Sequence, residues 1–213
     1  MRFSFANDNS PYIISCRIPC SLFCLSPMPV IEQGILSGLQ YPRTLTVKRV
    51  TAADAARQFT KCLSEHGTED IVPVGIAYHI SSKGDMDFMC LAQPNTEDIL
   101  LISLRNSKFG ELAALLCAEG GSCQPPSPKV CLVGFGMPQI AVLISHATSL
   151  RVRGVDLLTL LRKSSPSEVI QKMVGKGVKS FAVGRLWMGN KASATKDIAL
   201  RAWLAAWYVP DVT

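Results

Sequence analysis

Short apolar runs and helical spacings alternate along the middle of the chain, most clearly from Lys129 to Leu161. The run after Pro128 is too short for a helix and predicts a strand buried on both faces. Gly134 and Gly136 then predict a tight turn into a helix, because apolar residues follow at helical spacing. A second short strand and the start of another helix follow. The stretch therefore predicts an α/β unit.

Earlier in the chain, Leu45 to Val50 alternates as a short strand, and Thr51 to Asp54 is a capping box that opens a helix ending near Ser64. Three strand-like runs come next, at residues 71–80, 86–92 and 99–104. Turn-forming residues separate these runs, so we expect an antiparallel meander.

Further helices are predicted at residues 109–118, from Pro166 to about residue 174, and at residues 195–208. Antiparallel strands followed by parallel strands with crossover helices indicate an α/β fold. We expect a mixed sheet, with three antiparallel strands and then parallel ones, and helices on both faces.

The first 44 residues show no sustained period and carry five prolines. We expect residues 1–44 to be an irregular or poorly ordered leader, and residues 45–213 to be the folded domain. A hydrophobic content of 48% with 18% charged residues excludes a disordered chain. The first residues do not read as a signal peptide, and no run of eighteen apolar residues occurs. We therefore expect an intracellular protein, nuclear or cytoplasmic, without a membrane span.

The chain has eight cysteines, which raises the question of a metal site. Cys16, Cys20 and Cys24 lack both a usual zinc spacing and a nearby histidine, so we expect no metal there. Four others lie inside apolar patterns and are expected to be buried small hydrophobes: Cys62, Cys90, Cys117 and Cys131.

The positive charge of the chain is concentrated near its C-terminal end. Residues 151–201 contain eleven Lys and Arg against three acids, a balance of +8, whereas the rest has eleven against thirteen, or −2. Such a segment suits a polyanion such as nucleic acid, and a solvated basic face is an equal alternative.

Eight short segments between Leu45 and Tyr208 together resemble the segments of a known domain family. They are the strand and helix 47–63, the strands 74–76, 89–92 and 99–104, the strand and glycine turn 129–136, and the pieces 154–160, 167–176 and 200–208. In order and spacing they resemble the 3′-to-5′ exonuclease domain of the Werner helicase and RNase D type. That resemblance to the DEDD superfamily implies an RNase H-like fold.

The family needs four carboxylates to hold two divalent metals that activate water on a phosphodiester. The resemblance places the first two at Ala77 and His79, and the next at Ile140. It places the tyrosine and aspartate of the last helix at Ala202 and Ala206. Every expected ligand is missing, so we expect no catalytic residue, no metal site and no cofactor. Mg²⁺ or Mn²⁺ would be needed only if activity were retained.

Replacement ligands are few. Asp85 and Asp87 are expected in the hairpin, where a metal cage would need a rearranged site. Asp156 matches a position that starts a helix and favours its free N–H groups. His79 and His146 are far apart in sequence and are not expected to form a pair.

Three functions follow from these patterns. The first is a catalytically degenerate exonuclease-like domain that binds single-stranded RNA or DNA, or a nuclease-pathway partner, without cleaving. The second is a protein-interaction scaffold on the RNase H-like fold, docking a partner through the helix with Trp203 and Trp207. The third is an active metal-dependent exonuclease with a shifted site. Phosphate contacts in the first case are expected from Lys172, Lys176, Lys179, Arg185 and Lys191.

Overall fold

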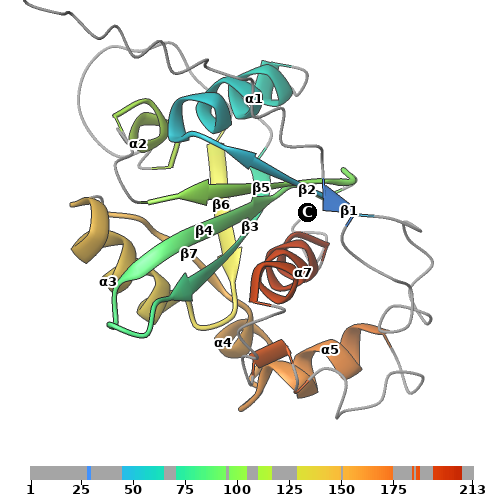
Figure 1. Cartoon of the computed structure of the whole chain (residues 1–213). Coiled ribbons are helices and arrows are strands. Elements are labelled where there is room, and N and C mark those ends of the chain that lie inside the picture. The colour runs from blue at the N-terminus through green and yellow to red at the C-terminus, as the bar shows by residue number, and fades with distance from the viewer. Residues whose placement is uncertain are drawn as a thin grey trace, which may run out of the picture.

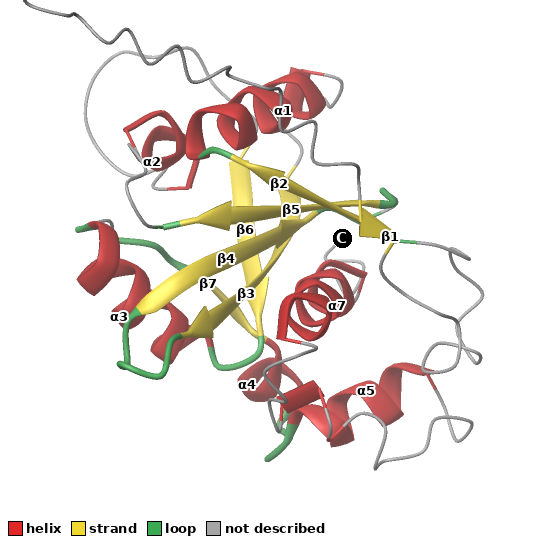
Figure 2. Cartoon of the chain, viewed as in Figure 1, coloured by secondary structure: helices red, strands yellow, loops and turns green. Residues whose placement is uncertain are grey.

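A single sheet with helices on both faces forms the core of the protein (Figures 1 and 2). The computed structural model describes residues 28–29, 45–64, 71–94, 96–104, 110–116, 129–149, 151–174, 184, 186–187 and 194–207. Within these, the sheet has seven strands in the order β1-β2-β5-β4-β3-β6-β7. The strands are β1 (Met28–Pro29), β2 (Thr46–Val50), β3 (Ile71–Ile80), β4 (Met86–Ala92), β5 (Asp98–Ser103), β6 (Lys129–Gly134) and β7 (Gly154–Asp156).

The strand pairings confirm the predicted mixed sheet. β3 pairs antiparallel with β4, and β4 pairs antiparallel with β5, which is the predicted meander. β6 pairs parallel with β3, and β7 pairs parallel with β6. The pattern did not predict that β2 would join the other edge of the meander, where it runs parallel to β5.

The helices divide between the two faces of the sheet (Figure 1). One face packs on α1 (Ala52–Ser64), α2 (Gly110–Leu116) and α3 (Met137–Thr148). The other face packs on α4 (Leu157–Leu161), α5 (Pro166–Val174) and α7 (Ala194–Trp207). The predicted helices on both faces are thus confirmed. None of the helices in the described ranges is long and apolar enough to cross a membrane.

The start of α1 follows its predicted capping box. The Asp54 backbone N–H donates to Thr51 Oγ1 at 3.1 Å, and the Thr51 hydroxyl donates to Asp54 Oδ2 at 2.8 Å. The threonine thus satisfies a backbone donor that the helix itself leaves unpaired.

α7 lies directly on β3, and small residues make this approach possible. Gly75, on β3, faces Ala202 and Ala206 of the helix. A Cβ on Gly75 would clash with the Ala202 carbonyl oxygen and would lie 2.8 Å from the Ala206 Cβ. The position therefore requires glycine because two backbones meet there.

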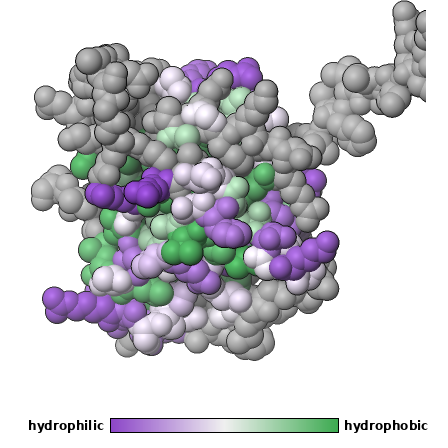
Figure 3. Space-filling model, turned by 90° about the vertical axis from the view of Figure 1, so that its left-hand side faces the viewer, coloured by the Kyte–Doolittle hydropathy of each residue, from purple (hydrophilic) through white to green (hydrophobic). Residues whose placement is uncertain are grey.

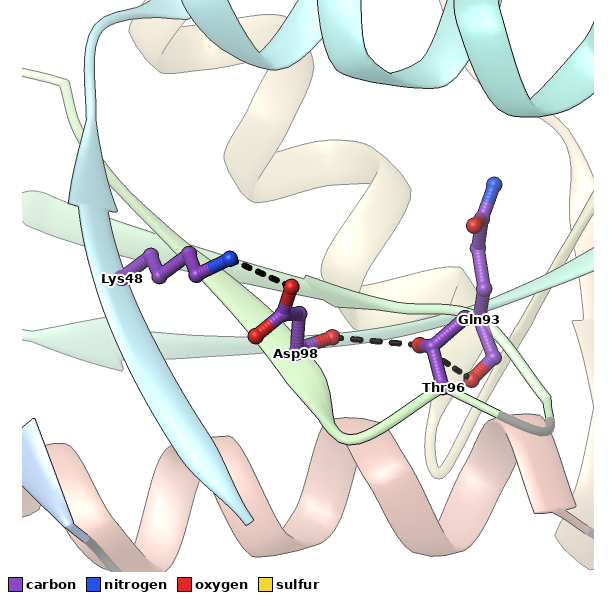
Figure 4. A network of polar contacts seen from close by, with 4 residues as sticks. All are labelled: Lys48, Gln93, Thr96 and Asp98. Atoms are coloured by element: carbon purple, nitrogen blue, oxygen red, sulfur yellow. Dashed lines mark hydrogen bonds and ion pairs between the residues drawn. The ribbon is translucent and has the colours of Figure 1, made fainter. Parts of the chain in front are cut away.

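Polar contacts fasten the edge of the sheet where β2 joins β5 (Figure 4). Lys48 on β2 pairs with Asp98 on β5. The Thr96 hydroxyl donates to the Gln93 carbonyl oxygen at 3.1 Å, in the connection before β5. Beyond β2, the leader contributes β1, where Met28 and Pro29 pair antiparallel with β2. The rest of residues 1–44 lies outside the described residues.

Candidate functional site

A small hollow lies where β3, the turn after β6, α3 and α7 meet. It brings together two of the positions that the resemblance singled out, Ala77 on β3 and Ile140 on α3. Phe135, Trp187 and Arg201 also line it. Its volume is about 10 Å³, close to the smallest space that holds one water. Side chains therefore fill the space between these elements. Among the five residues named, only Arg201 is charged.

Arg201 is the polar centre of the hollow. Its Nη2 donates to the Tyr78 carbonyl oxygen and its Nε to the Asp197 carbonyl oxygen, each at 3.4 Å. Its guanidinium carbon lies 5.9 Å from the centroid of the Trp187 ring, within cation–π range. The Trp187 ring meets Phe135 edge to face, with ring centroids 5.3 Å apart.

The charge of Arg201 is only partly compensated. Burial lowers the pKa of its guanidinium, while Tyr78, Asp197 and Cys90 act in the opposite direction. Arginine nevertheless stays protonated at neutral pH. Among the described residues, no carboxylate forms an ion pair with Arg201. The hollow thus holds a half-buried cation whose charge Asp197, one turn earlier in α7, offsets without forming an ion pair.

The family resemblance does not single out Arg201, although it points to the next residue in the chain. It assigned the tyrosine and aspartate positions of the last helix to Ala202 and Ala206, but both alanines are buried against β3. Arg201 is the α7 residue that lines the hollow with Ala77 and Ile140. The signal that was available is its charge, since Arg201 interrupts an otherwise apolar helical run.

His79 lies away from this group of residues and pairs with Asp87. Its Nδ1 is 2.6 Å from Asp87 Oδ1, and its ring lies 6.4 Å from that of Phe88. As expected, Asp87 belongs to the hairpin of β3 and β4. It lies in β4, within the strand predicted at residues 86–92, and is 9% exposed. A register shift of β3 at His79 and Ile80 accompanies this pairing.

The other candidate ligands are dispersed. His146 shares a different hollow, of about 270 Å³, with Asp85, so His79 and His146 do not come together. Within the described ranges, no group of three or more His, Cys, Asp or Glu side chains has an arrangement that holds a metal ion.

Asp156 has the structural role that was predicted for it. One carboxylate oxygen accepts from the Gly136 N–H at 2.7 Å and the Met137 N–H at 3.3 Å. The other accepts from the Thr159 N–H at 3.3 Å and from its hydroxyl at 2.7 Å. Burial alone would raise the pKa of Asp156, but these hydrogen bonds outweigh it and lower the pKa. The carboxylate thus caps α4 and fixes the glycine turn before α3.

The cysteines that the structure describes fit their predicted place in apolar surroundings. Cys90 is fully buried between β4 and α7, whereas Cys62 and Cys131 are half-buried. Burial raises the pKa of the Cys90 thiol far above its ordinary value, against the influence of Arg201. Cys90 is therefore a neutral packing residue. Cys16, Cys20, Cys24 and Cys117 lie outside the described residues.

Of the five expected phosphate contacts, Lys172 lies in the described part of the chain. It is exposed on α5. Other exposed bases of the same segment are Arg151, Arg162 and Lys163, around α4. The expected contacts Lys176, Lys179, Arg185 and Lys191 lie outside the described residues.

The side of the molecule that carries α3 has a different character (Figure 3). There, hydrophobic residues gather near the centre and hydrophilic ones surround them. α3 has no Lys, Arg, Asp or Glu between Met137 and Thr148, and its Val142 is 68% exposed. Contacts with phosphates are therefore not expected from α3 itself.

The two tryptophans of α7 differ in exposure. Trp203 is 2% exposed, whereas Trp207 is half-buried, and the two rings stack with centroids 6.2 Å apart. Trp203 therefore belongs to the core. Of these two tryptophans, a partner docking on α7 would contact only Trp207.

Comparisons with known proteins give matches in structure and none in sequence. No protein-family model matches the chain, and no curated protein is similar to it. The exonuclease domain of Nibbler from Aedes aegypti has a TM-score of 0.49 and 14% identity, over 75% of this chain and 83% of that one.

Two further solved structures are similar to this chain. Trypanosoma brucei RNase D, solved in a complex with RNA, has a TM-score of 0.46 and 13% identity, over 82% of this chain and 65% of that one. The EXD2 exonuclease domain, soaked in Mg and dGMP, has a TM-score of 0.40 and 20% identity, over 64% and 67%. All three structures thus match this chain at 20% identity or less.

Proposed function

We propose that this protein is a catalytically degenerate 3′-to-5′ exonuclease-like domain that binds single-stranded nucleic acid without cleaving it. The observation that carries the proposal is the hollow that Ala77, Ile140 and Arg201 share. At two positions where the sequence resemblance implies carboxylates, Ala77 presents a methyl group and Ile140 a branched alkyl chain. The Arg201 guanidinium lies beside them.

This arrangement opposes the binding of the two metals that cleavage needs. Apolar side chains offer no oxygen ligand to Mg²⁺, which requires them. A divalent cation about 5 Å from the Arg201 guanidinium would also be repelled by roughly 7 kcal/mol at an effective dielectric constant of about 20. The site chemistry therefore favours loss of two-metal catalysis.

Binding is supported by the charge distribution. The segment from Arg151 to Arg201 carries a balance of +8, and its described bases include the exposed Lys172, Arg162 and Lys163. Clustered Lys and Arg contact phosphates without reading bases, so we expect binding with little preference for sequence.

A combined binding and cleavage assay tests the proposal. Labelled single-stranded RNA and DNA are incubated with the full chain at 50 mM salt, with Mg²⁺ or Mn²⁺. We expect retention on a filter that weakens steeply as salt rises, and no shortened product on a denaturing gel. Metal-dependent shortening from the 3′ end would overturn the loss of catalysis. Absence of binding at low salt would overturn the nucleic-acid partner.

A further inference from the structure

We infer that Arg201 forms a metal-independent binding site for a phosphate group. This inference rests on the proposed function, because it assigns a ligand to the same hollow. In a two-metal exonuclease the positive charge that holds a phosphate belongs to the ions. Here the protein supplies a positive charge itself, from a side chain fixed on α7.

The first argument is that the positive charge of the Arg201 guanidinium is incompletely compensated. Arg201 is half-buried, and no carboxylate among the described residues pairs with it. Asp197, one turn earlier in α7, offsets this charge only in part. Taking an incompletely compensated cation out of water is costly, and an anion lowers this cost. A site with this imbalance therefore favours an anionic ligand.

The second argument is the availability of donors. Nε and Nη2 each donate to a backbone carbonyl oxygen at 3.4 Å, which is long for such a bond. Nη1 makes no hydrogen bond with any described residue. Arginine binds phosphate oxygens with paired donors, and such charge-assisted bonds are shorter and stronger than neutral ones.

The third argument concerns how the cation is held. Trp187 lies under the guanidinium at 5.9 Å, and Phe135 supports the Trp187 ring from its edge. The Tyr78 carbonyl oxygen holds the other side. Because these contacts fix the side chain before a ligand arrives, little conformational entropy remains to be lost on binding.

The size of the hollow limits how the ligand binds. A space of about 10 Å³ admits no phosphate, so the group binds at the mouth, where the exposed part of Arg201 is reached. The ligand is thus a terminal or free phosphate that presents two oxygens to one guanidinium.

Titration calorimetry in EDTA tests the site, with adenosine 5′-monophosphate, inorganic phosphate and adenosine as probes. We expect both phosphate-bearing probes to bind and adenosine not to bind. Arg201→Gln should weaken binding roughly tenfold or more, as expected for loss of a charge-assisted pair. The affinity of Arg201→Lys should lie between those of the wild type and Arg201→Gln. Lysine keeps the positive charge but loses the paired N–H donors of the guanidinium. Lys196→Ala, an exposed change on the same helix, should leave binding unchanged.

The wild-type protein provides the decisive result if a variant does not fold. Failure of adenosine 5′-monophosphate to bind or to raise the Tm of the wild type in EDTA overturns the inference. The inference is also overturned if a folded Arg201→Gln variant binds adenosine 5′-monophosphate as tightly as the wild type does. In either case, salt-dependent retention of oligonucleotides would leave the proposed function standing. Conversely, phosphate binding through Arg201 with no retention of oligonucleotides would overturn the proposed function and leave this site.

Oligonucleotides with and without a 3′-phosphate distinguish a strand end from a free phosphate.

Discussion

At the scale of single residues, Asp156 connects two parts of the chain with one carboxylate. It accepts from the Gly136 and Met137 N–H groups before α3 and from Thr159 in α4. Hydrogen bonds to the charged form lower its pKa despite its burial. Because the folded pKa is depressed, the carboxylate contributes stability above the ordinary Asp pKa of about 3.9. That contribution is lost as the pH falls through the folded pKa.

Asp156→Asn should therefore destabilise the protein by about 1 kcal/mol at pH 7, because charge-assisted hydrogen bonds become neutral ones. The difference from the wild type should shrink as the pH falls below about 3.9, where the carboxylate takes up a proton in the unfolded chain. It should be lost once the pH has passed the lower pKa of the folded state. Urea unfolding at pH 7 and pH 3 measures both values. The exposed Asp85→Asn serves as the control, and an equal loss in both variants would argue against the role of Asp156.

The same scale shows where sequence patterns succeed and where they fail. The capping role of Thr51 follows from local spacing alone, and so it was predicted. Arg201 was not predicted at this hollow, because the residues that line it with Arg201, such as Ala77 and Ile140, come from other elements. The pairing of Asp87 with His79 was not predicted, because the two residues lie on different strands. Contacts between distant residues leave no periodic trace.

At the scale of elements, the packing of α7 on β3 depends on the absence of side chains. Gly75 faces the backbone of Ala202 and the Cβ of Ala206. The two alanines also belong to the core cluster that includes Ala77 and Cys90. Small residues at these positions therefore set the distance between the helix and the sheet.

Gly75→Ala should cost about 3 kcal/mol of unfolding free energy, because the added methyl meets backbone atoms that have no room to move. Gly110→Ala is the matched control. A Cβ there meets nothing within 4 Å, so we expect a change within about 1 kcal/mol, on the stabilising side. Urea denaturation followed by circular dichroism compares the two. Similar effects of both substitutions would mean that α7 moves aside easily.

Most elements were predictable because their periodicity is local. The meander, the strand at β6 and the helices α1, α3 and α5 follow from runs and turns within a few residues. The sheet order was only partly predictable. The parallel pairing of β2 with β5 joins segments about fifty residues apart, from Thr46 with Asp98 to Val50 with Ile102. The local pattern of a strand does not indicate which other strand it pairs with.

At the scale of the whole molecule, the positive charge is concentrated in one segment of the chain. The basic excess lies in the segment that forms β7, α4, α5 and the start of α7. α3 presents an uncharged side, and α1 covers the opposite face of the sheet from α5 (Figure 1). A nucleic acid attracted by the basic segment should therefore bind on one side of the protein.

Lys172→Ala should weaken binding of single-stranded RNA. It should also reduce the slope of log affinity against log salt by about 0.7, which is the loss of one phosphate contact. Lys61→Ala, an exposed change on α1, should leave the slope unchanged although the net charge changes equally. Filter binding over a series of salt concentrations measures both slopes. The same decrease in both variants would indicate an effect of net charge and no defined surface.

The position of α7 in the chain has a consequence for biosynthesis. The strands from β2 to β7 are translated before residues 194–207, yet one face of the sheet, with Ala77, Cys90 and Ile99, packs on α7. Until that helix leaves the ribosome, the nascent chain exposes this apolar face. Exposed apolar surface of this kind aggregates or recruits chaperones, so premature termination before residue 194 would yield an aggregation-prone product.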